Sequence, residues 1–256
     1  MQTWRKLRST DSHGRSVSLA ATILMLILPG TVFSQVVDTN RPGFSFTPGV
    51  VPVGRWQLET GISYDRFNSS SDSTSLPLAE ARFGLTDGVE LFVSSVNWVD
   101  RTNGTSSSSG LADMAVGTKL ALTGAEAKTR MALLFQVSLP VGDSDFTSDR
   151  YDPSAAFIWT YNGRVPMAGT VKVSRFREGF QLDNSFKLPF SLGGAHSTFV
   201  EWEANLPEGP GNDTHWINGG YQWLLNDRTQ LDANAGFGLN DRAGDYRLGA
   251  GFSVLF

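Results

Sequence analysis

The sequence predicts an all-β fold, a transmembrane antiparallel β-barrel of about twelve strands. Two observations predict it: an alternating run at the carboxy terminus, and the same period-two pattern along the preceding chain. In residues 246–256 apolar side chains occupy one parity and mostly glycine, serine and arginine the other, and the run finishes on Phe256. In water, an apolar edge strand of this kind would invite aggregation. We therefore expect it to close a barrel in a bacterial outer membrane, with Phe256 forming part of the signal for the barrel-insertion machinery.

Residues 1–34 contain the three regions of a secretory signal peptide in their usual order. Basic residues between Arg5 and Arg15 precede the apolar run 19–28, and a small-residue site follows it. This run is too short to span a bilayer as a helix, which takes about 20 residues. We expect cleavage after Ser34, and the small pair Ala20-Ala21 offers an alternative site.

From residue 54 onward, the chain divides into short runs in which apolar and polar side chains alternate. Such runs are typical of transmembrane strands with an apolar outer face and a polar inner face. The phase becomes ambiguous after Ser94, which predicts a bulge there. Ten or fourteen strands would also fit, because short runs are easily missed. The expected strands are residues 55–65, 79–85, 89–98, 113–122, 131–139, 155–159, 167–176, 180–188, 198–204, 217–223, 230–239 and 246–256.

The connections between these runs alternate in length. Short turns facing the periplasm and long loops facing outward are typical of outer-membrane barrels, although soluble β-sandwiches also have alternating strands and turns. Closure is required in lipid because every backbone N–H and C=O group must be paired. Short turns are expected at 86–88, 124–128, 162–164, 191–195 and 226–228, long loops at 68–75, 101–110, 141–150, 177–179 and 206–214, and a short loop at 240–245.

Composition excludes several classes of protein. The chain has no cysteine, so it forms no disulfide framework and no thiolate metal site. The net charge is −4, and removing the basic signal peptide makes it −7. An acidic chain of this kind argues against a nucleic-acid partner. No phosphate loop, dinucleotide fingerprint or metal-ligand spacing is present, so we expect no cofactor and no metal.

The two faces of the strands predict different roles. Outward aromatic residues near strand ends are expected to form a girdle at the lipid interfaces: Trp56, Tyr64, Trp202, Tyr221, Trp223 and Tyr246. The charged side chains on the inner parity would point into the lumen, where they either line a narrow polar pore or fill it with ion pairs. The residues selected as lumen lining are Arg55, Glu59, Glu80, Arg82, Lys119 and Glu201; the wider inward set adds Glu90, Asp113, Lys172, Asp183, Lys187, Glu203, Asp232 and Arg247.

Catalysis is a competing function, since some outer-membrane barrels are hydrolases. After the signal peptide the chain keeps two histidines, His196 beside Ser197 and His215 beside Asp213. Neither lies in a nucleophile elbow or another catalytic motif. We therefore expect no enzymatic activity and assign no catalytic residue.

The segment before the first strand carries a family resemblance. It reads Asp-Thr-Asn-Arg-Pro-Gly-Phe-Ser over 38–45 and Val-Pro-Val-Gly-Arg-Trp-Gln-Leu-Glu-Thr-Gly over 51–61, with further matches at 83–91 and 137–142. These blocks resemble a bacterial outer-membrane family labelled "transporter", the phenol-degradation meta-pathway outer-membrane proteins. The resemblance implies a barrel that passes small, hydrophobic or aromatic compounds. Asn40 stands where the family leads us to expect an acidic residue.

We divide the chain into a signal peptide (1–34), a periplasmic lead or partial plug (35–53) and the barrel (54–256). Arg41 and Pro42 are the expected plug residues, with Arg41 meeting a lumen acid such as Glu59 or Glu80; a disordered lead is the alternative. The expected function is passive passage of a small solute across the outer membrane of a Gram-negative bacterium. The expected partners are outer-membrane lipid, the insertion machinery and that solute. A sealed barrel acting through its long loops is the runner-up, and a hydrolase the third candidate.

Overall fold

The computed structural model describes residues 36–176 and 179–256, so the expected signal peptide lies outside the described residues. No helix among the described residues is long and apolar enough to cross a membrane. The same residues contain fifteen β-strands, and every pairing between named strands is antiparallel. The strands are β1 (Trp56–Asn68), β2 (Ser71–Leu76), β3 (Glu80–Thr86), β4 (Val89–Ser94), β5 (Trp98–Asn103), β6 (Ser106–Leu111), β7 (Met114–Ala121), β8 (Thr129–Leu139), β9 (Asp152–Tyr161), β10 (Met167–Phe176), β11 (Gly179–Gly193), β12 (His196–Pro207), β13 (Thr214–Asn226), β14 (Thr229–Gly238) and β15 (Tyr246–Leu255).

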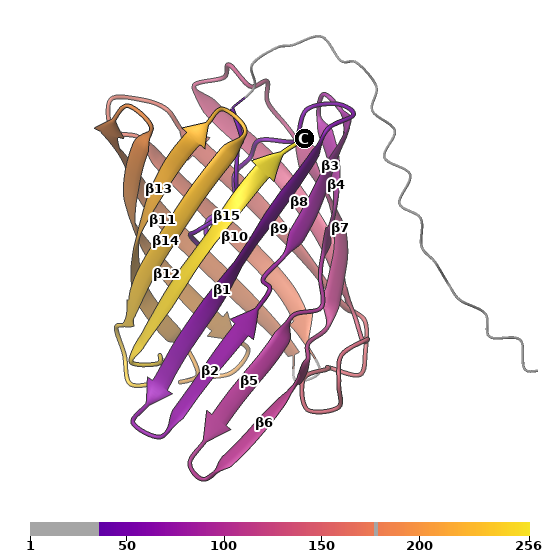
Figure 1. The fold of residues 1–256 in the computed structure, drawn as a ribbon, viewed down its shortest axis with the longest axis vertical. Helices are drawn as coiled ribbons and strands as arrows, with labels where there is room; N and C mark the ends of the chain where they lie inside the picture. The colour runs from indigo at the N-terminus through magenta and orange to yellow at the C-terminus, as the bar shows by residue number, and fades with distance from the viewer. Residues whose placement is uncertain (1–35, 177–178) are drawn as a thin grey trace, which may run out of the picture. The chain divides into compact units, whose positions relative to one another are not determined.

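The strands form one sheet that closes on itself. β15 pairs with β1 in a ladder running from Gln57 opposite Leu255 to Arg66 opposite Tyr246. Figure 1 shows these two strands side by side at the front of the barrel. The β1–β15 ladder is called the seam below. Closure leaves no edge along this ladder to meet lipid, which is the condition for a sheet to cross a membrane.

Three neighbouring wall strands are each interrupted once, which is why fifteen elements make a wall of twelve strands. The interrupted pairs are β2 with β3, β4 with β5, and β6 with β7. Single backbone bonds keep the wall connected at these breaks, for example from Leu78 N–H to Gly61 C=O at 2.8 Å. Pro77 lies in the first break, where its missing N–H costs no ladder bond. The predicted twelve-stranded barrel is confirmed, and the bulge expected near Ser94 coincides with the second break.

Burial is inverted relative to a water-soluble protein. Arg82 and Lys119 are 0 % exposed inside the barrel, whereas Phe135 and Val200 are 44 % and 47 % exposed on its outer face. An apolar exterior around a charged interior is stable only if the exterior faces lipid. The ends of the barrel are named by its connections: the periplasmic end has the tight turns 87–88, 194–195 and 227–228, and the extracellular end has the loop 140–151.

Two of the loops predicted from the sequence are wrong. Residues 68–75 and 101–110 were expected to be long polar loops, but they form most of β2 and β6, half of β5, and tight hairpin turns. Figure 1 shows these strands projecting beyond the rest of the wall at the extracellular end. Their serine and threonine side chains are polar on both faces, so the period-two signal that marks lipid-facing strands is missing. The connection expected at 177–179 is also shorter, because β10 ends at Phe176 and β11 begins at Gly179.

The outer face gives a direct stability prediction. Val200→Arg places a cation on the lipid face of β12 and is expected to lower the free energy of unfolding in vesicles by about 2–4 kcal/mol. Leu192→Arg, also outward but at the periplasmic end of β11, is expected to cost about 0–1 kcal/mol. Denaturant unfolding of both variants in the same vesicles tests this. Equal costs at the two depths would show that this face does not lie in the bilayer.

Candidate functional site: the lumen and its N-terminal lead

The chain before β1 lies inside the barrel. We call residues 36–53 the lead. The start of the lead is hydrogen-bonded to a turn at the periplasmic end, where Val37 N–H donates to Asp227 C=O at 2.7 Å. The lead crosses the lumen so that Phe46 N–H reaches Thr170 Oγ1 on β10 at 3.0 Å, and it returns to a parallel bridge between Val53 and Gly84. The lead therefore forms a folded-back segment across the lumen.

Buried glutamates from the wall accept the N–H groups of the lead. An irregular segment inside a barrel has no strand neighbours for most of its backbone, so side chains must supply the partners. Carboxylates suit this task because each accepts several hydrogen bonds. The donors and acceptors are Asn40 and Arg41 to Glu59, Phe44 and Ser45 to Glu201, and Val51 to Glu90, at 2.7–3.2 Å.

Buried cations bind the carbonyl groups of the same segment. Arg82 donates to the carbonyl oxygens of Asp38 at 2.8 Å and Gly49 at 3.2 Å. Lys119 also reaches the Gly49 carbonyl, at 3.1 Å. On the opposite wall, Lys187 donates to the Ser45 carbonyl at 3.1 Å. Both halves of the lead backbone are thus held by charged groups of the wall.

These charges also pair with one another. Arg82 lies between Glu59 and Glu90, with ion-pair distances of 2.7 and 2.8 Å, and Lys119 contacts Glu90 at 3.2 Å. Desolvation makes an unpaired buried charge costly, so each member depends on the others. We call Glu59, Arg82, Glu90 and Lys119 the lumen network.

Arg41 docks against the seam. Its Nη2 lies 3.1 Å from Oδ1 of Asp232 on β14, a carboxylate that is fully buried. Gly61 of β1 and Gly251 of β15 are opposite each other in the seam, and a Cβ on either would come within 2.5 Å of Arg41 Nη2. The missing side chains make room for the guanidinium. The sequence predicted a lumen acid as the partner of the Arg41 side chain but named Glu59 or Glu80; the structure instead has Asp232, and Glu59 binds only the Arg41 N–H.

Asn40 uses both ends of its amide. Its Nδ2 donates to Glu80 Oε1 at 2.9 Å, and its Oδ1 accepts from Thr47 N–H at 3.2 Å. An acidic side chain here could not donate to Glu80 and would add a negative charge near Glu59. The Asn40 amide therefore fits the carboxylates that surround it.

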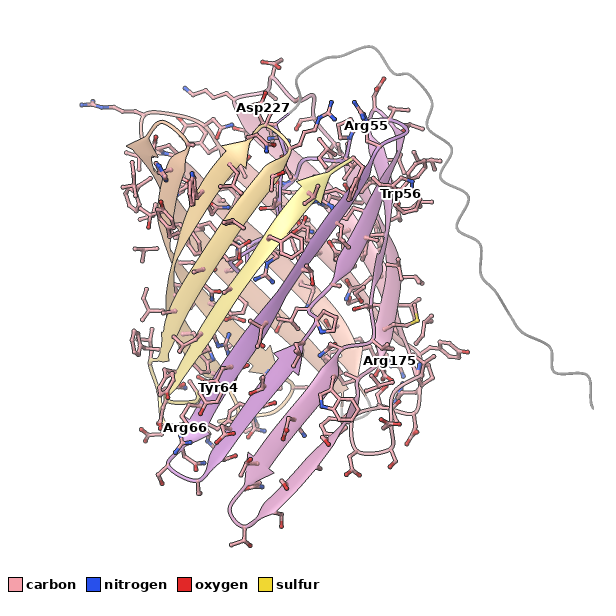
Figure 2. All side chains as sticks on the ribbon, viewed as in Figure 1. Arg55, Trp56, Tyr64, Arg66, Arg175 and Asp227 are labelled. Atoms are coloured by element: carbon pink, nitrogen blue, oxygen red, sulfur yellow. The ribbon has the colours of Figure 1, made fainter. Side chains whose placement is uncertain are left out.

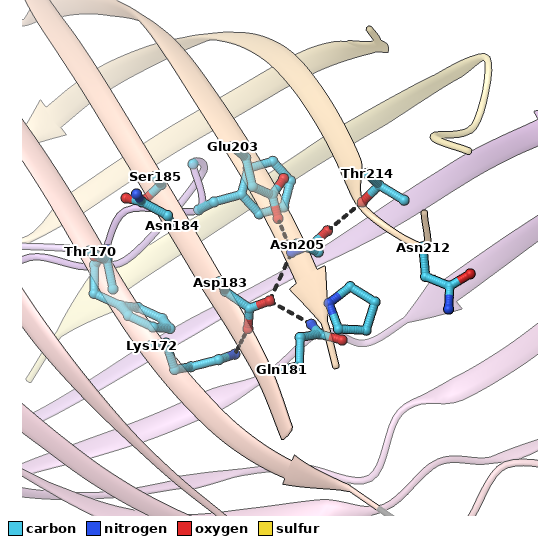
Figure 3. A pocket seen from close by; sticks show the side chains of 14 residues that line it. Thr170, Lys172, Gln181, Asp183, Asn184, Ser185, Glu203, Asn205, Asn212 and Thr214 are labelled. Atoms are coloured by element: carbon cyan, nitrogen blue, oxygen red, sulfur yellow. Dashed lines mark hydrogen bonds and ion pairs between the residues drawn. The ribbon is translucent and has the colours of Figure 1, made fainter. Parts of the chain in front are cut away.

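The lead separates two cavities. One, on the extracellular side, has a volume of about 520 Å³ and is drawn in Figure 3. The other, on the periplasmic side, has a volume of about 600 Å³ and is lined by lead residues such as Val50 and by the turn at 124–126. Between them, Phe46 packs against an apolar part of the inner wall made by Phe92, Leu134, Ile158 and neighbouring alanines.

Four of the six selected lumen residues, Glu59, Arg82, Lys119 and Glu201, are fully buried and bind the lead backbone. Glu80 is half-buried and contacts Asn40, and Arg55 lies at the periplasmic end just before β1 (Figure 2). Four side chains that bind the lead are missing from this selection. Glu90, Lys187 and Asp232 belong to the wider set that the alternation placed in the lumen. Thr170 was not named, although its hydroxyl lies on the inner face of β10.

The selected aromatic residues lie toward the two ends of the wall except Trp202, which is in the middle of β12 opposite Phe186 of β11. Figure 2 shows Trp56 and Tyr64 at opposite ends of β1. Trp56 packs on Phe83 at a ring distance of 4.8 Å, and Tyr64 lies 6.1 Å from Tyr246 across the seam. Trp202 is stacked on His215, and Tyr221 and Trp223 flank His196.

The two histidines have structural partners. His196 Nδ1 lies 2.6 Å from the Tyr221 hydroxyl, and His215 Nε2 lies 2.9 Å from Asp213 Oδ2. Among the described residues, neither ring is hydrogen-bonded to a serine or threonine hydroxyl, and no group of three or more metal-binding side chains is found.

Residues 39–256 match the family described as "Putative MetA-pathway of phenol degradation". The chain belongs to this family. The match begins inside the lead rather than at β1, so the folded-back segment is part of the family pattern. No curated protein matches the chain.

Several solved structures have a similar fold. The COG4313 outer membrane channel from Pseudomonas putida F1 superposes with a TM-score of 0.65 at 13 % identity, covering 81 % of this chain and 97 % of that one. The translocator domain of the autotransporter NalP from Neisseria meningitidis gives 0.52 at 7 % identity, covering 80 % and 89 %. The KdgM porin gives 0.50 at 12 % identity, covering 78 % and 99 %. At these identities the likeness concerns the barrel fold alone.

The Arg41–Asp232 pair is expected to hold the lead against the seam. Arg41→Ala leaves Asp232 buried without its cation and is expected to lower the free energy of unfolding by about 3–5 kcal/mol, with part recovered in the double variant with Asp232→Ala. The control is the pair Arg66–Asp72 in the β1–β2 hairpin, which is 3.0 Å apart with both side chains 27 % exposed and is expected to contribute about 0–1 kcal/mol. Denaturant unfolding in vesicles measures both cycles. A cost for Arg41→Ala no larger than that of Arg66→Ala would contradict the role of the pair.

Proposed function

We propose that the protein is a non-enzymatic channel of the outer membrane of a Gram-negative bacterium, through which small hydrophobic or aromatic solutes pass passively. The lead closes the channel at rest. Family membership and the resemblance of the fold to an outer membrane channel support this proposal.

The observation that supports the proposal is the way the lead crosses the lumen. One segment separates the two cavities, and apart from the bridge at Val53 its backbone is held largely by wall side chains rather than by strand pairing. These bonds hold the lead at separate points, so its release does not require a continuous ladder to open. Displacement of the lead would join the cavities without breaking a wall strand.

The solute class is supported by the inner wall. Phe92, Leu134 and Ile158 form an apolar surface on which Phe46 rests, and this surface would face the passage once the lead moved. Arg55, Glu59, Glu80, Arg82, Lys119 and Glu201 would then line the polar side. A passage with one apolar and one polar side favours small aromatic compounds over strongly charged ones.

A sealed barrel that binds a surface partner is the second candidate. The projecting hairpins of β1–β2 and β5–β6 favour it, because they extend the wall beyond the apolar band (Figure 1). Substitutions at 101–110 and 206–214 would abolish that function, whereas substitutions in the lumen would not. In both proposals the barrel-insertion machinery recognises β15 and Phe256, and outer-membrane lipid surrounds the wall.

Glu201→Gln tests the channel. The variant loses the charge that accepts two lead N–H groups, and weakening these bonds by about 1.4 kcal/mol would raise the open probability about tenfold. Single-channel recording in planar bilayers measures this, and the exposed Asp100→Asn is the control for loss of one carboxylate charge. A folded Glu201→Gln protein that gates like the control would refute a lead-gated channel.

A further inference from the structure

The cavity on the extracellular side of the lead has the size of a ligand site. Its volume of about 520 Å³ lies within the range of small-molecule pockets. Phe44 and Phe46 of the lead form its floor, and β10 to β13 form its wall (Figure 3). We call this cavity the vestibule.

The charges of the vestibule are neutralised within the protein. Lys172 Nζ lies 3.2 Å from Asp183 Oδ2, and Arg247 Nη1 lies 3.1 Å from Glu203 Oε2. The Arg247 guanidinium also covers the Phe44 ring, 4.7 Å from its centroid. A charged ligand would therefore meet no unpaired counter-charge and would still lose its hydration on entering.

The two carboxylates of the polar wall, Asp183 and Glu203, accept hydrogen bonds from neighbouring side chains. The amide of Asn205 donates to both Asp183 Oδ1, at 3.0 Å, and Glu203 Oε1, at 3.1 Å. The Thr214 hydroxyl donates to Asn205 Oδ1 at 3.0 Å, and Gln181 donates to Asp183. These donors are directed at wall acceptors, and each carboxylate has about four lone-pair positions, so positions on Asp183 and Glu203 stay open. A ligand with hydroxyl donors can therefore bind to them.

We propose that the vestibule binds a neutral ring compound that carries hydroxyl groups. Its ring lies on the Phe44 and Phe46 side chains, and its hydroxyl groups donate to Asp183 and Glu203. Aromatic diols and sugar rings share this chemistry, since both present an apolar face and hydroxyl donors. The proposal rests on the proposed channel function only in that the solute enters from the extracellular side.

Because the floor of the site belongs to the lead, binding and closure are linked. Phe44 N–H is held by Glu201 and Phe46 N–H by Thr170, so both rings are in place only while the lead is docked. A ligand that binds only the docked state stabilises that state. Bound solute therefore lowers the open probability, and the vestibule acts as a holding site before passage.

The test is calorimetric titration of the refolded full mature chain with five probes: catechol, glucose, toluene, benzoate and benzylammonium. Catechol or glucose is expected to bind at least tenfold more tightly than the other three. Binding by catechol alone would assign the site to aromatic diols, and binding by glucose alone would assign it to sugars. No binding of either, or equal binding of toluene, benzoate or benzylammonium, would overturn the proposal.

Two variants test the geometry. Phe46→Ala is expected to weaken binding about fivefold or more, because an aromatic contact is lost, whereas Val50→Ala on the periplasmic side of the lead leaves the affinity unchanged. Asp183→Ala leaves Lys172 without its partner, so benzoate is expected to gain affinity while the hydroxylated probe loses it. Unchanged probe preference in Asp183→Ala would overturn the charge argument.

Single-channel recording separates this proposal from the channel function. Saturating catechol or glucose is expected to lower the open probability. A protein that conducts and gates but binds neither probe would refute the vestibule site alone, and a protein that binds a probe but never conducts would refute the channel alone.

Discussion

The structure depends on one constraint, that each backbone N–H and C=O removed from water must have a partner. The wall meets it by closing β15 onto β1. The lead cannot join that ladder, because it crosses the lumen, so charged side chains bind its backbone instead. An unpaired buried group costs about 1–3 kcal/mol, and the lead presents many such groups. The charged side chains inside this barrel therefore supply the hydrogen-bond partners that the irregular lead requires.

The same constraint extends to the charged side chains of the lumen. Charges that hold the lead must themselves be paired, which produces the lumen network of Glu59, Arg82, Glu90 and Lys119. This network belongs to the wall, and its ion pairs join wall residues to one another without a residue of the lead. The Arg41 side chain makes a contact of another kind. It lies against Gly61 and Gly251, which are neighbours only when β1 and β15 are paired in the seam. The Arg41 contact therefore depends on closure of the barrel.

The wall could be predicted from sequence because lipid on one face and polar groups on the other impose a period of two, as in β12 and β15. The same parity placed Glu59, Arg82, Lys119 and Glu201 inside. Prediction failed where that contrast is missing: the serine-rich β6 was taken for a loop. It was also incomplete for the contacts between the lead and the wall. Nothing in the spacing of Arg41 and Asp232 joins them, because their contact arises from the path of the lead.

The most direct test of the account is to tether the lead to the wall. Ser45 Oγ lies 2.9 Å from Ser185 Oγ of β11, and the chain has no cysteine, so Ser45→Cys with Ser185→Cys introduces a single disulfide. Single-channel recording of this variant before and after reduction is the measurement. The account predicts that the oxidised protein stays closed and that reduction restores opening, while Ser185→Cys alone does not respond to reductant. Equal conductance in the oxidised and reduced states would show that the lead does not gate the lumen.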